Sequence, residues 1–248
     1  MLAIDAGNSN LTVARIAGGE VIARRVILRP EVTTATTEAA LRSLGDSDTT
    51  VLSSVVPTLT PLLEAAATTA TGRPPHRLTH TSPHGLRFAV PEPATTGVDR
   101  IAAACGALDH AAPPLIVVDC GTATTVTLID RDTSGAPLYR GGAIAPGGGT
   151  ALAALRERAP HLPEPAAPPL PDVGNTSATA IAIGALAGHA AMIDGLIDRL
   201  TAAIATPGRI AIFVTGGWAR QCLPYLRHPY THDPDLVLHG LAAIAARL

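Results

Sequence analysis

Two segments of this chain carry an aspartate and a glycine in the same setting. The first reads LAIDAGNSN and places Asp5 at the end of a short apolar run, and the second reads IVVDCGTATT and places Asp119 in the same way. An aspartate that ends a buried strand lies beside exposed backbone N–H groups, and the following glycine lets a ligand approach them closely. Such N–H groups, together with hydroxyl and amide side chains, form a cradle for phosphate oxygens, and the carboxylate is a ligand for Mg²⁺. Both segments therefore predict chemistry on a phosphate group.

Two copies of this pattern are stronger evidence for a phosphate site than one copy. Asp-Gly turns are common in β-hairpins, so a single copy is best explained as a plain turn. Two matched strand–turn–strand copies, nearly half the chain apart, indicate a duplicated domain instead. We therefore predict two half-domains with the phosphates of a nucleotide between them, and Mg²⁺ to neutralise charge during phosphoryl transfer.

Two further glycine-rich segments point the same way. Residues 215–217 read TGG after an apolar run, where bare backbone at Gly216 and Gly217 would accept a flat ligand such as adenine or ribose. A plain turn between a strand and a helix explains these residues as well. Residues 141–149 read GGAIAPGGG, which is too dense in glycine for a routine turn because each glycine costs entropy on folding. We expect this segment to be a loop that contacts a ligand or packs tightly at a domain junction.

Asp99 and Arg100 stand in the segment GVDR, at the start of a predicted helix. Aspartate at a helix start usually caps the helix N-terminus. Alternatively, Asp99 accepts a hydrogen bond from a substrate hydroxyl as a general base. Arg100 would then bind an anionic group, either the transferring phosphoryl group or a substrate carboxylate. The residues alone do not decide between these interpretations.

Composition and charge exclude several classes of protein. The 248 residues have a net charge of −2, which gives no electrostatic reason to expect nucleic-acid or membrane-surface binding. All 18 basic residues are arginine, so a P-loop with its lysine is excluded. The three cysteines form no CxxC pair, which favours reduced thiols over zinc ligands or disulfides. The chain shows no signal-peptide pattern and no uninterrupted apolar stretch of the roughly 18–20 residues that span a bilayer, so we expect a cytoplasmic protein.

The elements that must position these residues alternate between strands and helices, which is typical of an α/β fold. Short β-branched runs predict strands at residues 2–4, 11–16, 21–28, 50–52, 115–119, 125–129 and 210–214. Runs rich in Ala and Leu with helical spacing predict helices at residues 37–44, 57–71, 99–111, 150–158, 177–205 and 236–248. The Pro-rich residues 161–173 are expected to form an extended surface loop. A helix that ends in His-Ala-Ala-Pro-Pro sets a domain boundary and gives halves of residues 1–112 and 113–248.

Five motifs occur in an order that resembles one known family. The segments DAGN, GVDR, DCGTATT, GGAIAPG and TGG follow one another here as they do in type III pantothenate kinases, and the resemblance covers essentially the whole chain. It implies an acetate-kinase/sugar-kinase/Hsp70/actin fold of two RNase-H-like halves with a nucleotide cleft between them. It also implies ATP-dependent phosphorylation of pantothenate, the first step of coenzyme A synthesis. The enzyme would be a homodimer that needs Mg²⁺ and a monovalent cation, potassium or ammonium.

The resemblance also implies roles for particular residues. Asp99 is the expected catalytic base, and Asp5 and Asp119 are the expected metal ligands. The nucleotide is expected to contact Asp5, Gly7, Asn8, Asn10, Gly121, Thr122, Thr124, Thr125, Gly216 and Gly217. Pantothenate is expected to contact Phe88, Gly97, Asp99, Arg100 and Thr176, with Thr176 reaching across the dimer.

Phe88 is the main departure from the family pattern. Members often carry tyrosine at this place, and residues 88–96 form a slightly longer run than usual. A kinase for another small hydroxylated acid or amide is therefore one alternative. A non-catalytic regulatory protein on the same fold is another, but it predicts damaged phosphate loops or a missing Asp99, and this chain retains all of them.

Overall fold

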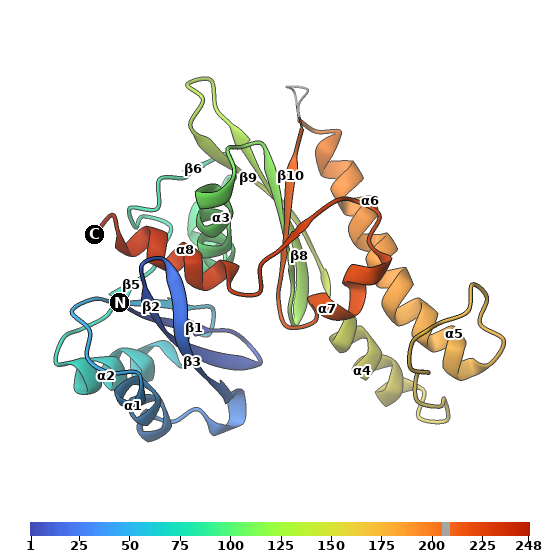
Figure 1. The fold of residues 1–248 in the computed structure, drawn as a ribbon, viewed down its shortest axis with the longest axis horizontal. Coiled ribbons are helices and arrows are strands. Elements are labelled where there is room, and N and C mark those ends of the chain that lie inside the picture. Colours follow the sequence, from blue (N-terminus) through green and yellow to red (C-terminus); the bar gives the residue numbers. More distant parts are fainter. Residues whose placement is uncertain (205–208) are drawn as a thin grey trace. The chain divides into compact units, whose positions relative to one another are not determined.

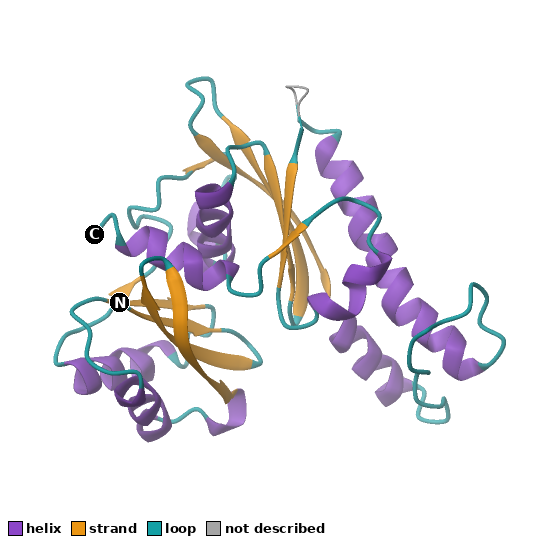
Figure 2. Cartoon of the chain, in the orientation of Figure 1, coloured by secondary structure: helices purple, strands orange, loops and turns teal. Residues whose placement is uncertain are grey.

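The structure is a computed structural model, and it describes residues 1–204 and 209–248. The chain divides into two compact units. The first unit contains Met1–Ala112, Arg131–Tyr139 and Asp235–Leu248, and the second contains Pro113–Asp130 and Arg140–Pro234. Figure 2 shows helices, in purple, around the orange strands of each unit. The boundary between duplicated halves at residues 112 and 113 stays a prediction.

The sheet of the first unit is built around the hairpin that carries the first aspartate. β1 (Leu2–Ala6) pairs antiparallel with β2 (Asn10–Ala17), and β2 pairs antiparallel with β3 (Glu20–Leu28). On its other side β1 pairs parallel with β4 (Thr50–Ser54), which pairs parallel with the short β5 (His76–Arg77). The order β3-β2-β1-β4-β5 places β1 in the centre, so its last residues have a neighbouring strand on both sides.

Helices complete the first unit. α1 (Thr34–Ser43) and α2 (Thr60–Thr71) lie side by side (Figure 1), and their apolar side chains form one core with those of β1, β2 and β4. Thr33 begins α1 with a capping box, in which its hydroxyl accepts from the Thr36 N–H. α8 (Leu236–Ala245) also contacts β1 and β4, so the last helix of the chain belongs to the N-terminal sheet.

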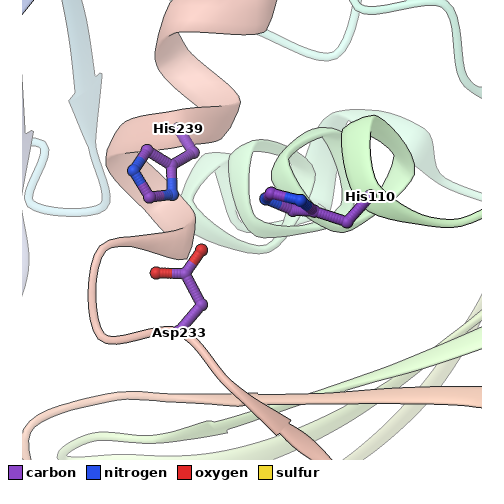
Figure 3. Close-up of side chains that lie close together, drawn as sticks. All are labelled: His110, Asp233 and His239. Carbon is purple, nitrogen blue, oxygen red and sulfur yellow. The ribbon is translucent and has the colours of Figure 1, made fainter. Parts of the chain in front are cut away.

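α3 (Val98–His110) and α8 pack closely against each other because each offers a glycine at the contact. A Cβ at Gly106 or at Gly240 would collide with the backbone of the other helix. The imidazole rings of His110 and His239 stand edge to face near this contact, with centroids 6.3 Å apart. Figure 3 shows this pair of side chains; Asp233, which it also draws, belongs to the second unit.

The sheet of the second unit repeats the order of the first. β7 (Leu115–Cys120) pairs antiparallel with β8 (Ala123–Arg131), which is followed in the sheet by β9 (Pro137–Pro146). On its other side β7 pairs parallel with β10 (Ala211–Thr215), which pairs parallel with β11 (Thr231–His232). The order β9-β8-β7-β10-β11 therefore matches β3-β2-β1-β4-β5 strand for strand. The second aspartate, like the first, lies near the end of a central strand.

One long helical stretch dominates the second unit. α5 (Ser177–Ile183) continues through a π-helical segment (Gly184–Gly188) into α6 (His189–Thr201). The buried side of α6 packs with α7 (Ala219–Cys222) on β7, β8 and β10 in a second apolar core. α4 (Gly148–Arg158) follows β9 and is largely exposed.

By length and composition, Ser177–Thr201 is the one helical stretch of the described residues that could cross a membrane. Its C-terminal part, α6, packs in the apolar core of the second unit. Asp194 is fully buried in it and accepts hydrogen bonds from the backbone N–H and the Nε of Arg227. A buried carboxylate held in this way belongs to a packed interior, because an unpaired charge in an apolar medium is costly.

The structure confirms the seven predicted strands, and two of its differences from the sequence prediction concern glycine-rich or helical segments near the site. Residues 141–146 are not a loop but the end of β9, and a side chain at Gly142 would collide with the Val126 carbonyl oxygen of β8. Close approach of two strands therefore explains the glycine there. The helix predicted at residues 177–205 includes the π-helical segment and ends at Thr201, and Ala205 lies outside the described residues. Residues 161–173 have no helix or strand, as predicted.

Candidate active site

The first hairpin holds Asp5 one residue before the end of β1. Asp5 pairs with Thr12 across the hairpin and with Ser53 on β4. The turn is closed by the Gly7 N–H, which donates to the Asn10 carbonyl oxygen at 3.0 Å. Residues 8–10 of the turn are exposed, so their backbone and side chains are accessible to a ligand.

Ser53 is the closest polar neighbour of the first aspartate. Its hydroxyl donates to Asp5 Oδ1 at 2.9 Å, and its side chain is fully buried. Burial raises the pKa of Asp5 from 3.8 to about 6, while the Ser53 hydrogen bond opposes this rise and repulsion from Asp99 adds to it. Asp99 belongs to the same unit as Asp5, within range of this charge repulsion.

Asp99 stands in the first turn of α3 but does not cap it. The N-cap residue is Gly97, and no side-chain hydrogen bond caps the helix there. Asp99 Oδ1 instead accepts the Arg100 N–H at 2.7 Å. Burial raises the pKa of Asp99, and the hydrogen bond and charge of Arg100 oppose the rise. The interpretation of Asp99 as an N-cap is therefore wrong, and its carboxylate is partly buried near Asp5.

Phe88 lies in the short strand β6 (Arg87–Phe88), which pairs with the start of β9. Its ring is 5.4 Å from the His84 ring, edge to face, and 5.4 Å from the buried Tyr139 ring. The residue that departs from the family pattern is thus packed in an aromatic cluster of the first unit.

The second hairpin holds Asp119 in the same register as the first. Asp119 pairs with Thr125 across the hairpin and with Thr215 on β10, as Asp5 pairs with Thr12 and Ser53. The turn is one residue shorter, and the Gly121 N–H closes it by donating to the Ala123 carbonyl oxygen at 3.0 Å.

Thr122 and Thr124 have different surroundings in this hairpin. Thr122 is exposed, and its carbonyl oxygen accepts hydrogen bonds from the Gly147 N–H at 3.0 Å and the Thr150 hydroxyl at 2.7 Å. Thr124 is fully buried, and its hydroxyl shares a hydrogen bond of 2.9 Å with His189 Nε2. Successive strand residues point to opposite faces, so Thr125 lies on the face of Asp119 and Thr124 on the other.

The Gly216–Gly217 turn lies directly beside the second aspartate. Gly216 has φ +96°, and a Cβ there would collide with Asp119 Oδ1 and with the Cys120 backbone. After the turn, the Trp218 N–H donates to the Cys120 carbonyl oxygen at 2.9 Å. Only glycine fits at this position, since a side chain would be both strained and blocked.

Thr176 is the N-cap residue of α5. Its hydroxyl accepts the Thr179 N–H in a capping box, at 3.2 Å, and the residue is exposed. It belongs to the second unit, whereas the other residues predicted to contact pantothenate belong to the first.

Comparison with known proteins decides the family. The family described as type III pantothenate kinase matches residues 1–199. A type III pantothenate kinase of Thermomicrobium roseum is 33% identical over 259 residues, covering 100% of this chain and 97% of that protein. One of Rhizorhabdus wittichii is 35% identical over 267 residues, covering 100% of this chain and 98% of that protein. This chain belongs to the type III pantothenate kinase family.

Solved structures agree with the fold of a type III pantothenate kinase. A Baf family protein from Campylobacter jejuni has a TM-score of 0.66 at 19% identity, covering 100% of this chain and 98% of that chain. An inorganic polyphosphate/ATP-glucomannokinase from Arthrobacter sp. strain KM has a TM-score of 0.51 at 14% identity, covering 100% and 97%. These likenesses show the fold alone, which is the predicted α/β fold of the sugar-kinase type.

Type III pantothenate kinases use ATP and a divalent metal, and the residues present fit both groups. Carboxylate oxygens are the ligands that Mg²⁺ prefers, and Asp5 and Asp119 each offer them beside the open turn of a hairpin. The Gly216 backbone lies against Asp119 with no room for a side chain, as expected of a site that admits a ligand to bare backbone.

Sequence reasoning missed four residues around the hairpins of this kinase. They are Ser53, Thr215, His189 and Trp218. Only the sheet register relates the first two, because Ser53 pairs with Asp5 as Thr215 pairs with Asp119. Aligned end to end, TVLSS and AIFVT place Ser53 opposite Val214 instead. No local signal marks His189 or Trp218, because their contacts join segments far apart in the sequence.

Proposed function

We propose that this kinase transfers the γ-phosphoryl group of ATP to pantothenate and forms 4'-phosphopantothenate, the first step of coenzyme A synthesis. One observation carries the proposal. The full-length likeness to type III pantothenate kinases comes with two intact Asp-x-Gly hairpins and with Asp99 in the same unit as Asp5.

The two hairpins would bind the nucleotide. Bound Mg²⁺, held by Asp5 and Asp119, would neutralise charge on the phosphates as the phosphoryl group moves. Hairpin N–H groups and polar side chains would bind phosphate oxygens, and the second glycine turn would carry the adenosine. The proposed nucleotide-binding residues are Asp5, Gly7, Asn8, Asn10, Gly121, Thr122, Thr125, Gly216 and Gly217. Thr124, which the sequence also predicted to contact the nucleotide, is fully buried on the opposite face of the hairpin and is hydrogen-bonded to His189.

Asp99 would act on the pantothenate hydroxyl. The transition state of phosphoryl transfer is loose, so an alcohol needs correct placement more than early deprotonation. A carboxylate that accepts the hydroxyl hydrogen bond supplies this placement first and takes the proton late. Because burial raises the pKa of Asp99, the carboxylate is a stronger base than an exposed aspartate.

The remaining proposed contacts would bind the rest of pantothenate. Arg100 follows Asp99 in α3 and offers a guanidinium for the pantothenate carboxylate. Phe88 and Gly97 would line the acceptor site. Thr176 would come from the partner subunit of a homodimer.

We also propose a homodimer, activation by potassium or ammonium, and a cytoplasmic location. The long apolar stretch Ser177–Thr201 supports the dimer, since only 33% of its most apolar window is buried within one chain. A fully active monomer in light scattering would contradict it. The monovalent cation rests on family membership, and equal rates in sodium, potassium and Tris buffers would contradict it.

Phe88 is the reason to consider a second acceptor substrate. Its ring packs on Tyr139 and His84, and the proposed acceptor site would lack the hydroxyl that the tyrosine often found in relatives would supply there. A coupled assay of ADP release with pantothenate and a panel of similar hydroxylated acids and amides separates the two candidates. We expect the highest kcat/KM with pantothenate. A tenfold preference for another acceptor would overturn the proposed substrate.

A further inference from the structure

A buried polar pair lies on the back of the second phosphate hairpin. The Thr124 hydroxyl and His189 Nε2 are 2.9 Å apart, and the two side chains are 0% and 7% exposed. Burial lowers the pKa of His189, so its imidazole is neutral at neutral pH. A neutral imidazole is both a donor and an acceptor, and here it satisfies a hydroxyl that water cannot reach.

His189 also touches the glycine turn beside that hairpin. Its ring stands edge to face on the Trp218 ring, with centroids 5.1 Å apart. Trp218 directly follows Gly216 and Gly217, and its backbone N–H donates to the Cys120 carbonyl oxygen in the hairpin strand. The indole also lies so close to Gly148 that a Cβ there would collide with the ring. One side chain of α6 therefore contacts both proposed nucleotide-binding elements of the second unit.

The first hairpin shows that this polar pair is not required by the fold. In the matched register, Ala6 pairs with Leu11 where Cys120 pairs with Thr124. Leu11 is 1% exposed and lies in the apolar core of the first unit. The apolar Leu11 is thus sufficient for packing behind the first hairpin. The second hairpin has the buried hydroxyl of Thr124 at this place, which must be hydrogen-bonded.

His189 also begins α6 directly after the π-helical segment Gly184–Gly188. Such segments are rare, and they occur frequently at functional sites because they re-aim the side chains that follow. The π-helical turn before α6 is consistent with the need for His189 to reach the Thr124 hydroxyl.

We infer that His189 is a positioning residue for nucleotide binding: through Thr124 and Trp218 it fixes the second phosphate hairpin relative to the Gly216–Gly217 turn. The inference rests on the proposed function in one respect, that these two elements bind the nucleotide. His189 itself contacts neither the phosphates nor the acceptor in this role.

Nucleotide affinity, rather than turnover, tests the inference. Calorimetric titration of the full chain with Mg²⁺ and ADP gives a dissociation constant that does not depend on the acceptor. We expect His189→Leu to weaken this affinity about tenfold, which corresponds to about 1.4 kcal/mol. Thr124→Val, which keeps the shape and removes the hydroxyl, has the same expected effect. His189→Gln, whose amide reaches the place of Nε2, is expected to stay within about threefold of wild type.

A double variant and a control make the result specific. Because both substitutions break the Thr124–His189 hydrogen bond, His189→Leu with Thr124→Val should weaken binding no more than His189→Leu alone. His228→Leu is the matched control: His228 bonds Asp198 of the same helix at 2.8 Å but does not contact the hairpin. We expect the control to leave nucleotide affinity unchanged, whatever it does to the melting temperature.

Several results would overturn the inference. They are wild-type affinity in both single variants, fully additive losses in the double variant, an equal loss in the His228→Leu control, or a His189→Gln variant as weak as His189→Leu. If His189→Leu does not fold, Thr124→Val and His189→Gln decide the question. A wild-type chain that binds Mg²⁺ and ADP but does not phosphorylate pantothenate refutes the proposed function and leaves this inference standing.

Discussion

The two aspartate hairpins share a register and differ in what surrounds them. Asp5 and Asp119 each lie between a hydroxyl residue on the parallel neighbour strand and a threonine across the hairpin. Beyond that shared frame, Asp5 has a second carboxylate nearby, that of Asp99. Asp119 has instead the bare backbone of Gly216 against its carboxylate.

This difference suggests that the two hairpins have different roles. The first hairpin is grouped with the proposed base and with most proposed pantothenate contacts, so we propose that it serves the chemical step. The second hairpin is grouped with the glycine turn and the His189 support, so we propose that it anchors the nucleotide. In this proposal, the neighbours of two equivalently placed carboxylates give them different roles.

The largest expected effect distinguishes the two aspartates by kinetics. Asp5→Asn should lower kcat at least about a hundredfold, because a metal-held charge stabilises the transition state by several kcal/mol and each 1.36 kcal/mol is tenfold in rate. Asp119→Asn should raise the KM for ATP by a larger factor than Asp5→Asn does. Steady-state kinetics over a range of ATP and Mg²⁺ concentrations measures both. Near-normal turnover in Asp5→Asn would remove it from the chemical step.

A substitution in the Gly216–Gly217 turn is expected to have a smaller effect than the aspartate substitutions. Gly216→Ala should destabilise the fold by about 1–3 kcal/mol and raise the KM for ATP, because φ +96° strains alanine and its Cβ meets Asp119. Gly217→Ala is the matched control, since nothing lies within 4 Å of a Cβ at that position. Thermal unfolding and ATP kinetics of the pair check this. Equal behaviour of the two variants would contradict the close fit at Gly216.

The smallest expected effect is a pH dependence of stability that belongs to the first hairpin. In the folded chain the pKa of Asp5 is about 6, above its value of 3.8 in an unfolded chain. The unfolded state therefore ionises first as pH rises, and stability falls between about pH 4 and pH 6 and stays lower above. Asp5→Asn should remove this fall and, without Mg²⁺, stabilise the protein at pH 7 by about 1–3 kcal/mol. Denaturant unfolding in EDTA at several pH values tests it, and identical pH profiles of wild type and variant would refute it.

The sequence predicted the central strands because their signal is local. Each aspartate follows a β-branched apolar run and precedes a glycine, so the strand, its end and the turn are all encoded within about ten residues. The internal repeat then predicted two related sheets, and the sheets have the same strand order. β9 was missed because its two glycines normally indicate a loop, whereas Gly142 is there to let β8 and β9 approach each other.

The surroundings of the aspartates could not be predicted in this way. Ser53 is 48 residues from Asp5, and His189 is 65 residues from Thr124, so only the folded chain brings each pair together. Asp99 was left between two interpretations because an aspartate near a helix start fits both. The N-cap position at Gly97 removes one of them.

The substitution Asp99→Asn tests most directly whether the first unit carries the chemical step. Asparagine keeps the size and the hydrogen-bond acceptor of the side chain but cannot take a proton from the pantothenate hydroxyl. We expect kcat for ATP-dependent phosphorylation of pantothenate to fall by about 10²–10⁴-fold, the usual contribution of a general base, with Mg²⁺–ADP affinity and melting temperature nearly unchanged. A variant with normal kcat would contradict the account, because no base would then be needed beside Asp5.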